Sequence, residues 1–298
     1  MVIAPHPDDE ALAAAGLIQR VLAGGGQVRV VLMTSGDGFP EGVETLDGVS
    51  TPTTAEYRNY GKEREQETVA AMKMLGVERS RISFLGFPDG GLCLLASRYL
   101  SANGRAFESW YTDRTRPPTS DLTAPGVRYR GADVRAEIER LLVEFAPTVV
   151  VVVHPEDQHP DHCSTYIFVQ EALDALSRRQ PSLSPRVLHY LVHFGQWPLS
   201  ADAGTGVRLE PPASFPPDDG RWTMLLLTPA EVAAKKGALL AYSSQMMVIG
   251  RFLLAFGRED ELFLEGRPAL APECWCDGEH VATEVPPGSR RRKPKAPQ

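Results

Sequence analysis

Short apolar runs rich in β-branched residues recur along the chain, and polar or turn-forming residues follow each run. Runs of this length and composition predict β-strands. The segment 148–153 is nearly all valine, which is typical of a central strand buried on both faces of a sheet. The predicted strands cover residues 2–4, 27–34, 81–85, 148–153, 186–194 and 222–227.

Segments with apolar residues three or four positions apart lie between these runs and predict amphipathic helices. One of them carries Val134, Ile138, Leu141 and Phe145 on a single helical face. Another begins at Thr228, where the pattern Thr-Pro-Ala-Glu predicts an N-cap and a capping box. We therefore expect an α/β fold, Rossmann-like, with a mostly parallel sheet, helices on both faces and loop insertions. The other predicted helices cover residues 10–22, 55–75 and 165–176.

Two stretches do not fit this alternation. Residues 97–130 are rich in Arg, Thr, Pro and Tyr with weak periodicity, and residues 200–219 are rich in Pro and Gly. Loops of this length in a compact domain are usually functional or disordered. We expect a single domain over residues 1–285, followed by a basic, disordered tail over residues 286–298.

The composition narrows the functional class. Hydrophobic residues make up 43% of the 298 positions, which suits a globular protein with a sizeable core. The net charge of −7 argues against nucleic acid as the main partner. No apolar run reaches the ~18 residues of a membrane span, and the first residues do not have the pattern of a signal peptide. We therefore expect neither a nucleic-acid nor a membrane partner.

The cysteines favour a cytoplasmic protein by default. Four cysteines in a chain of this length do not suggest a disulfide framework, so we expect a reducing compartment. The pair Cys274-x-Cys276 with His280 resembles half of a metal knuckle, but no second cysteine pair accompanies it. We therefore give this pair no function.

The first candidate for chemistry is the segment His6-Pro7-Asp8-Asp9-Glu10, where a predicted strand gives way to a predicted helix. In α/β sheets, ligands bind outside the carboxyl ends of the strands. Adjacent residues point in different directions, so Asp8 and Asp9 can take different roles. One carboxylate can bind a metal while the other handles protons.

The second candidate follows the valine strand and runs from His154 to His162. Within it, His159-Pro160-Asp161-His162 supplies two imidazoles three residues apart. Two histidines and one carboxylate suit Zn²⁺ in a site that keeps a position open for water. Because both candidates follow strands, we expect them to meet at one edge of the sheet.

Single histidines also have plainer interpretations. A lone buried histidine is more often structural than catalytic. For His154 we favour a supporting or structural role over that of a further ligand. His189 and His193 alternate within a predicted strand, so we expect both to be structural.

Taken together, the two motifs resemble the zinc-dependent N-deacetylases of the PIG-L/LmbE family, which act on N-acetylglucosamine-containing substrates. The first predicted strand has only residues 1–4 available to it, fewer than expected for a central strand, and Pro5 stands where a small residue is common in the family. Supporting similarity lies at residues 34–38, 64–77, 85–92 and 235–245.

The resemblance implies a role for each matched residue. His6, Asp9 and His162 would bind Zn²⁺, with Fe²⁺ as a possible occupant in the cell. Asp8 would be the general base, and His159 the acid that steadies the oxyanion and protonates the amine. The remaining implied roles are that Asp161 orients His159, keeping it protonated, and that Arg64 and Asp89 contact the sugar. A bell-shaped pH dependence follows, with Asp8 ionised and His159 protonated.

Substrate preference is expected to lie in the 97–130 insertion, where Trp110 and Tyr111 could stack on a sugar ring. An alternative of equal weight is that the insertion is a surface loop that packs on its own aromatic residues. The substrate would be a small amino sugar.

Two other functions are compatible with the same residues, and two are disfavoured. An amidase for a bulkier acyl group, such as a thiol-sugar conjugate, would use the same metal core, and a non-catalytic metal-binding protein is also compatible. A dinucleotide-binding oxidoreductase is disfavoured, because residues 5–9 offer carboxylates where that fold needs Gly-x-Gly-x-x-Gly. A serine hydrolase is disfavoured because the chain has no Gly-x-Ser-x-Gly elbow.

Overall fold

The computed structural model describes residues 1–118, 126–199, 208–216, 220–266 and 268. These residues form a seven-stranded sheet in the order β3-β2-β1-β4-β5-β7-β6. The first five strands in this order are parallel, and β7 and β6 continue the sheet in antiparallel fashion. The predicted Rossmann-like α/β fold is therefore confirmed. The strands are β1 (Val2–Ala4), β2 (Val30–Thr34), β3 (Ile82–Phe87), β4 (Val149–Val153), β5 (Arg186–Tyr190), β6 (Arg221–Leu226) and β7 (Asp260–Glu265).

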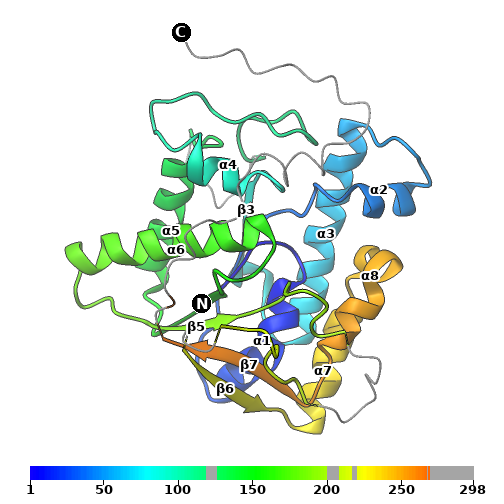
Figure 1. The fold of residues 1–298 in the computed structure, drawn as a ribbon, viewed down its shortest axis with the longest axis vertical. Helices are drawn as coiled ribbons and strands as arrows, with labels where there is room; N and C mark the ends of the chain where they lie inside the picture. The colour runs from blue at the N-terminus through cyan, green and yellow to red at the C-terminus, as the bar shows by residue number, and fades with distance from the viewer. Residues whose placement is uncertain (119–125, 200–207, 217–219, 267, 269–298) are drawn as a thin grey trace.

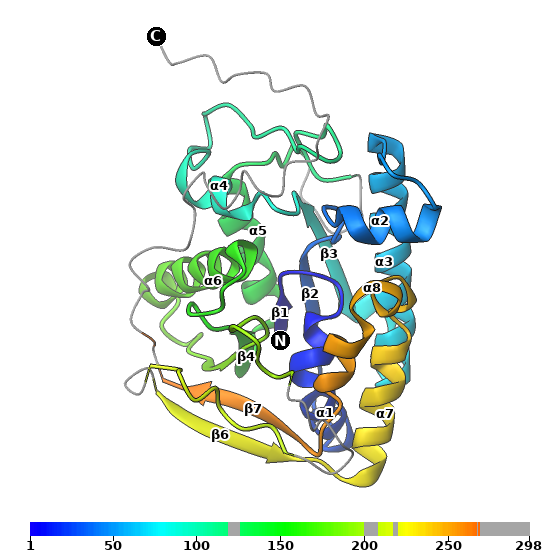
Figure 2. The same ribbon diagram turned by 45° about the vertical axis from the view of Figure 1, so that its right-hand side comes forward.

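Helices cover both faces of the sheet (Figure 1, Figure 2). One layer contains α1, α3, α7 and α8, and the other contains α4, α5 and α6, while α2 lies against α3 and α8. The helices are α1 (Asp9–Ala23), α2 (Pro40–Asp47), α3 (Thr54–Met74), α4 (Leu92–Ser97), α5 (Gly131–Phe145), α6 (Pro160–Arg179), α7 (Pro229–Leu240) and α8 (Ser243–Ala255).

The short strand β1 occupies the centre of the sheet. Ile3 pairs with Val31 of β2 on one side and with Val152 of β4 on the other, and all three residues of β1 are buried. The strand order reverses between β1 and β4, and ligands bind in the crevice at such a switch point. The loops that follow β1 and β4 carry the two sequence motifs.

Helix α1 is kinked at Ala14, whose φ and ψ are −138° and 15°. The side chain of Lys235 (α7) donates to the carbonyl of Leu12 at 2.9 Å. Gly16 and Leu17 donate their N–H groups to the carboxylate of Glu261 (β7), at 2.7 and 2.9 Å. Lys235 and Glu261 are themselves 2.9 Å apart. This buried ion pair, which we call the α1 clamp, therefore satisfies backbone groups at the kink.

Strand β5 ends at Tyr190, four residues before the predicted end of that strand. The backbone N–H groups of Val192 and His193 donate to one carboxylate oxygen of Asp157, at 2.8 and 2.9 Å. A side chain thus takes the hydrogen bonds that a strand partner would have used. The prediction that His193 lies within a strand is wrong, whereas that of a structural role is not tested by this contact.

Other element boundaries also differ from prediction. Helix α6 begins at Pro160 rather than at 165, because His159 acts as its N-cap and accepts from the N–H of Asp161. The late segment 235–245 is not one helix, since α7 ends at Leu240 and α8 begins at Ser243. The capping box at Thr228 and Glu231 is confirmed.

The described part of the 97–130 insertion is packed onto the domain. Phe107, Tyr111 and Tyr129 are buried, and Trp110 packs edge-on against Phe107 with ring centroids 5.4 Å apart. Tyr111 also faces the cavity described below. The described part of the insertion therefore packs on its own aromatic residues and also reaches the cavity, while its stacking on a sugar stays a prediction.

Cys93 and Cys163 are buried, and each takes part in a disulfide. The sequence predicts no disulfide framework and, from that, a reducing compartment; the disulfide bonding of these two cysteines removes the support for that compartment. Cys274, Cys276, His280 and the 286–298 tail lie outside the described residues. Within the described ranges, no helix combines the length and apolar character needed to cross a bilayer.

Candidate active site

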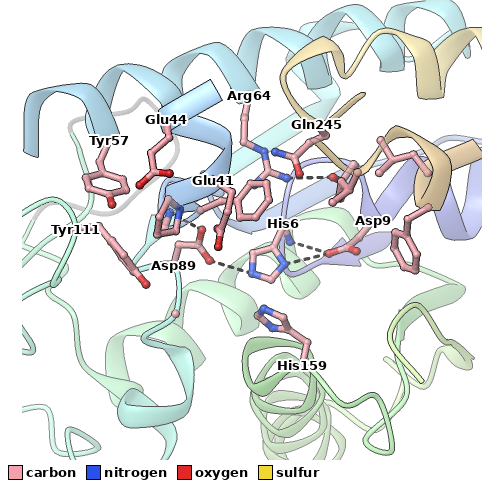
Figure 3. A pocket seen from close by; sticks show the side chains of 18 of the residues that line it. His6, Asp9, Glu41, Glu44, Tyr57, Arg64, Asp89, Tyr111, His159 and Gln245 are labelled. Carbon is pink, nitrogen blue, oxygen red and sulfur yellow. Dashed lines mark hydrogen bonds and ion pairs between the residues drawn. The ribbon is translucent and has the colours of Figure 1, made fainter. Parts of the chain in front are cut away.

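A cavity of about 570 Å³ opens at the carboxyl ends of the parallel strands. It is lined from the loop after β1 by His6, Asp8 and Asp9, and from the loop after β4 by His159. Helix α8 and helix α2 supply other parts of the wall (Figure 3). The two motifs, about 150 positions apart in the chain, thus meet at one site, as expected from the strand order.

Three side-chain atoms of the motifs converge on one point. Nδ1 of His6 lies 3.5 Å from Oδ2 of Asp9 and 3.2 Å from Nε2 of His162, and the last two atoms are 3.2 Å apart. We call these three atoms the ligand triad. Ligands ~2.0–2.1 Å from a tetrahedral Zn²⁺ lie roughly 3.3 Å from one another. The spacing of the triad therefore fits a divalent ion.

Carboxylates lie behind both imidazoles of the triad. Nε2 of His6 lies 3.1 Å from Asp89 and 3.4 Å from Asp161, and Nδ1 of His162 lies 3.2 Å from Asp157. Contacts of this kind fix the ring and the tautomer of a metal-binding histidine. All three of these carboxylates are buried.

The same carboxylates raise the pKa values of the histidines. Burial lowers the pKa of His162, but Asp157 and Asp9 outweigh it and raise the value to about 9. Burial also lowers the pKa of His6, but Asp89 and Asp161 outweigh it, so this pKa rises well above 6.5. The site is built to hold positive charge, and the chemistry of the donor set fits a metal cation.

Asp161 does not have the role that the sequence implied. Its carboxylate accepts from the N–H groups of Gly90 and Leu92, at 2.7 and 3.0 Å, and lies beside His6. The expectation that its side chain orients His159 is corrected by these contacts. The contact with His159 comes instead from the backbone N–H of Asp161, which donates to Nδ1 at 3.2 Å.

The contacts of His159 favour its neutral form over the expected protonated one. With Nδ1 accepting a hydrogen bond, the single ring proton sits on Nε2. Burial and the neighbouring imidazoles of His6, His162 and His193 hold the pKa of His159 well below 6.5. A protonated His159 would carry a second proton on Nδ1. That proton would face the N–H of Asp161, so the hydrogen bond between them would be lost.

Asp8 adopts a left-handed backbone conformation with φ 116°, which is strained for a residue other than glycine. Its N–H donates to Glu10 at 3.1 Å, and its Oδ2 lies 3.1 Å from the Arg64 guanidinium. Burial raises the pKa of Asp8 to about 7 against the opposing charge of Arg64. A buried carboxyl with such a pKa at a cavity wall is suited to proton transfer.

Arg64 lines the cavity but is engaged by the protein itself. Its NH groups donate to the carbonyls of Gly36 and Pro7 as well as to Asp8. Asp89 also lines the cavity, and it accepts from the N–H of Gly38 at 2.6 Å. Burial opposes ionisation of Asp89, yet His6 and Arg64 hold its pKa at about 2. The expected contacts of Arg64 and Asp89 with a sugar stay predictions.

Residues 1–173 match the PIG-L family, described as GlcNAc-PI de-N-acetylase. The chain belongs to the PIG-L family. A 1D-myo-inositol 2-acetamido-2-deoxy-alpha-D-glucopyranoside deacetylase of Rhodococcus opacus is 28% identical over 264 residues, covering 83% of this chain and 82% of the relative.

Solved structures share the fold. N,N'-diacetylchitobiose deacetylase from Pyrococcus horikoshii superposes with a TM-score of 0.53 at 17% identity, covering 88% of this chain and 81% of that one. A 4-carboxy-2-hydroxymuconate hydratase from Pseudomonas putida also superposes with a TM-score of 0.53, at 15% identity, with coverage of 86% and 81%. The fold of the PIG-L family is thus compatible with more than one reaction, so the reaction has to be inferred from the site residues.

The PIG-L match ends inside α6, but the site continues beyond it. His193 lines the cavity, with its ring centroid 4.8 Å from that of His162 and stacked at 5.4 Å on Phe252. Gln245 of α8 also lines the cavity and donates to the hydroxyl of Tyr60. Sequence reasoning missed both positions, and it missed His193 because the predicted strand ran to residue 194 whereas β5 ends at Tyr190.

His154 and His189 lie away from the ligand triad. His154 is fully buried, accepts from the N–H of Glu156 at 3.1 Å and contacts the rings of His189 and Phe215. Burial lowers the pKa of His154 to about 3 and that of His189 to about 4. Both are neutral histidines packed in the interior, in line with the structural interpretation of the sequence.

Proposed function

We propose that this chain is a metal-dependent N-deacetylase that removes acetyl from the amide of a small N-acetylglucosamine-type substrate. The observation that carries the proposal is the ligand triad, two of whose residues, His6 and Asp9, line the cavity together with Asp8 and His159. The deacetylases among the relatives support an acetamide as the reacting group.

His6, Asp9 and His162 would hold the metal, one ion per chain. Two imidazoles and a carboxylate suit Zn²⁺, and Fe²⁺ would accept the same ligands. When bound, the ion would acidify a water molecule and polarise the acetyl carbonyl. Asp157, Asp161 and Asp89 would keep the two imidazoles oriented toward it.

Asp8 would take the proton from the attacking water. Its carboxylate lies at the cavity wall, and Arg64 and Glu10 fix its position. The departing amine needs a proton, and Asp8 can give it the proton that was taken from the water. Asp8 would therefore serve first as base and then as acid, since a neutral His159 has no spare proton to give.

His159 would donate a hydrogen bond from Nε2 to the oxygen that becomes negative when water adds to the amide. A donor already in place costs no reorganisation when the charge develops. The backbone N–H of Asp161 holds the ring in the tautomer that this role needs.

Acetate release from several N-acetylglucosamine conjugates, measured beside hydrolysis of an amide with a larger acyl group, tests the proposal. We expect acetate from zinc-loaded protein and a loss of ~10²–10⁴-fold in kcat for Asp8→Asn with metal retained. Asp47→Asn, an exposed carboxylate on α2, serves as the matched control. Cleavage of the larger amide alone would overturn the deacetylase assignment. Full activity of Asp8→Asn would overturn the assignment of Asp8 as the base.

A further inference from the structure

The cavity extends well past the residues that would perform the chemistry. Glu41 and Glu44 of α2, Tyr57 of α3 and Tyr111 of the insertion line its other end, which we call the distal end. Figure 3 shows Glu44, Tyr57 and Tyr111 on the side of Asp89 away from Asp9, with Glu41 next to Asp89. The cavity lies within the range of ~300–1,000 Å³ that holds drug-sized ligands. It therefore has room for a group attached to the reacting amino sugar.

Tyr57 has an unsatisfied polar group at the distal end. The residue is 3% exposed, and its hydroxyl forms no hydrogen bond within the described chain. Burial, Glu44 and Glu41 raise its pKa to about 12, so the hydroxyl keeps its proton. Because an unpaired buried hydroxyl is costly, this group is suited to a polar ligand.

The charge at the distal end is negative and not compensated by the protein. Among the ion pairs of the described residues, none includes the carboxylate of Glu41 or Glu44. Arg64 is the guanidinium among the residues lining the cavity, and it is held by Asp8, Gly36 and Pro7. A ligand cation would thus be the counter-charge that these carboxylates lack.

Aromatic faces accompany the carboxylates. The rings of Tyr57 and Tyr111 lie with centroids 5.1 Å apart and planes inclined by 53°. Tyrosine faces attract ammonium groups, and carboxylates add a direct ionic contact. The two carboxylates and the two tyrosines, of which Tyr57 carries the unpaired hydroxyl, are groups suited to an amine that also carries sugar-like hydroxyl groups.

We propose, resting on the deacetylase function above, that the distal end selects substrates whose second part, beyond the N-acetylglucosamine, carries a positively charged amine. A neutral second part is accepted less well. A carboxylate or phosphate at that position is repelled by Glu41 and Glu44.

Three disaccharides of matched size test this inference: N-acetylglucosamine joined to glucosamine, to glucose or to glucuronic acid. At low salt we expect kcat/KM for the amine to exceed that for glucose by about 10-fold, with the acid slowest. The preference falls as salt rises, because screening weakens exposed charge pairs. In the double variant Glu41→Gln/Glu44→Gln the three values converge.

The matched control is Glu63→Gln/Glu78→Gln, which removes two exposed carboxylates away from the cavity and keeps the preference. Calorimetric binding of the same three disaccharides to the wild type and to both double variants gives a readout that needs no turnover. Absence of acetate from every disaccharide contradicts the proposed function, while the binding order still decides the inference. Equal binding of the three disaccharides to the wild type, or an unchanged preference in the Glu41/Glu44 variant, overturns the inference.

Discussion

Oδ2 of Asp161 lies 3.4 Å from Nε2 of His6, on the side of the imidazole opposite Nδ1. A carboxylate in that position keeps the proton on Nε2 and leaves Nδ1 free to bind a metal. Because the same carboxylate accepts two backbone N–H groups from residues 90 and 92, its position is tied to the loop after β3. Asp161, which is next to the proposed ligand His162 in sequence, thus supports the other proposed ligand, His6.

Asp161→Asn should weaken metal binding more than it slows the chemistry. We expect the Kd for zinc to rise by ~10–100-fold, with kcat at saturating metal little changed. Competition with a chromophoric chelator measures the first quantity. An unchanged Kd with a much lower kcat would instead show that Asp161 acts on His159, as its place in the sequence implied.

The ligand triad predicts which histidines determine metal content. His162→Asn should leave the purified protein without stoichiometric zinc, whereas His193→Asn should retain about one ion per chain. The reason is that Nε2 of His162 lies 3.2 Å from both His6 and Asp9, while His193 stands beside this group. Elemental analysis of both variants makes the comparison, and loss of zinc from the His193 variant would point to a different ligand set.

A pair of variants separates the two roles open to His159. Glutamine presents an N–H near the position of Nε2, and alanine presents none. If His159 only donates a hydrogen bond, His159→Ala should lose ~10²–10³-fold in kcat while His159→Gln recovers part of that loss. Equal losses in both variants, together with a bell-shaped pH profile, would restore the acid role that the sequence implied.

Breaking the α1 clamp should destabilise the fold. Lys235→Met leaves the charge of Glu261 buried without its partner and the carbonyl of Leu12 without a donor. Removing one partner of a buried pair costs about 3–5 kcal/mol, which urea unfolding would register as a lower midpoint. Lys236→Met, at the neighbouring half-buried position, is the control and should change the midpoint little.

His154 predicts loss of stability in acid. Its pKa is lowered to about 3 by burial and by His189, so between the unfolded value of 6.5 and this folded value the unfolded chain binds more protons. Stability is therefore present above pH 6.5 and falls as the pH drops, by up to about 1.4 kcal/mol per unit from this group. In metal-free protein, His154→Leu should show a shallower decline between pH 6.5 and 4, and parallel curves would refute the linkage.

The convergence of the two motifs could be predicted from the sequence. The segments around His6 and His162 follow strands that read clearly as apolar runs, and parallel strands end at the same edge of a sheet. Because β1 and β4 are parallel neighbours in the sheet, the two motifs that follow them lie together.

The pairing of carboxylates with imidazoles could not be predicted in this way. Asp157 and Asp161 both lie within a few residues of His159 and His162, and which ring each one faces depends on the turn into α6. The distal end escaped prediction for a related reason. Helix α2 has only eight residues, too few to give a clear periodic signal, and its partner Tyr111 lies in a segment of weak periodicity.

The ion pair of Lys235 and Glu261 also bears on how this enzyme could be recombined with its relatives. It joins the helix that begins at Asp9 to two elements beyond residue 228, outside the region of the family match. A chimaera that joins the first 173 residues to a foreign C-terminal part would keep every proposed ligand. It would nevertheless leave the bend in the first helix unsupported unless the donor supplied an equivalent lysine and glutamate. Swapping the part beyond residue 173 to change the pocket wall therefore requires these two positions to be carried across together.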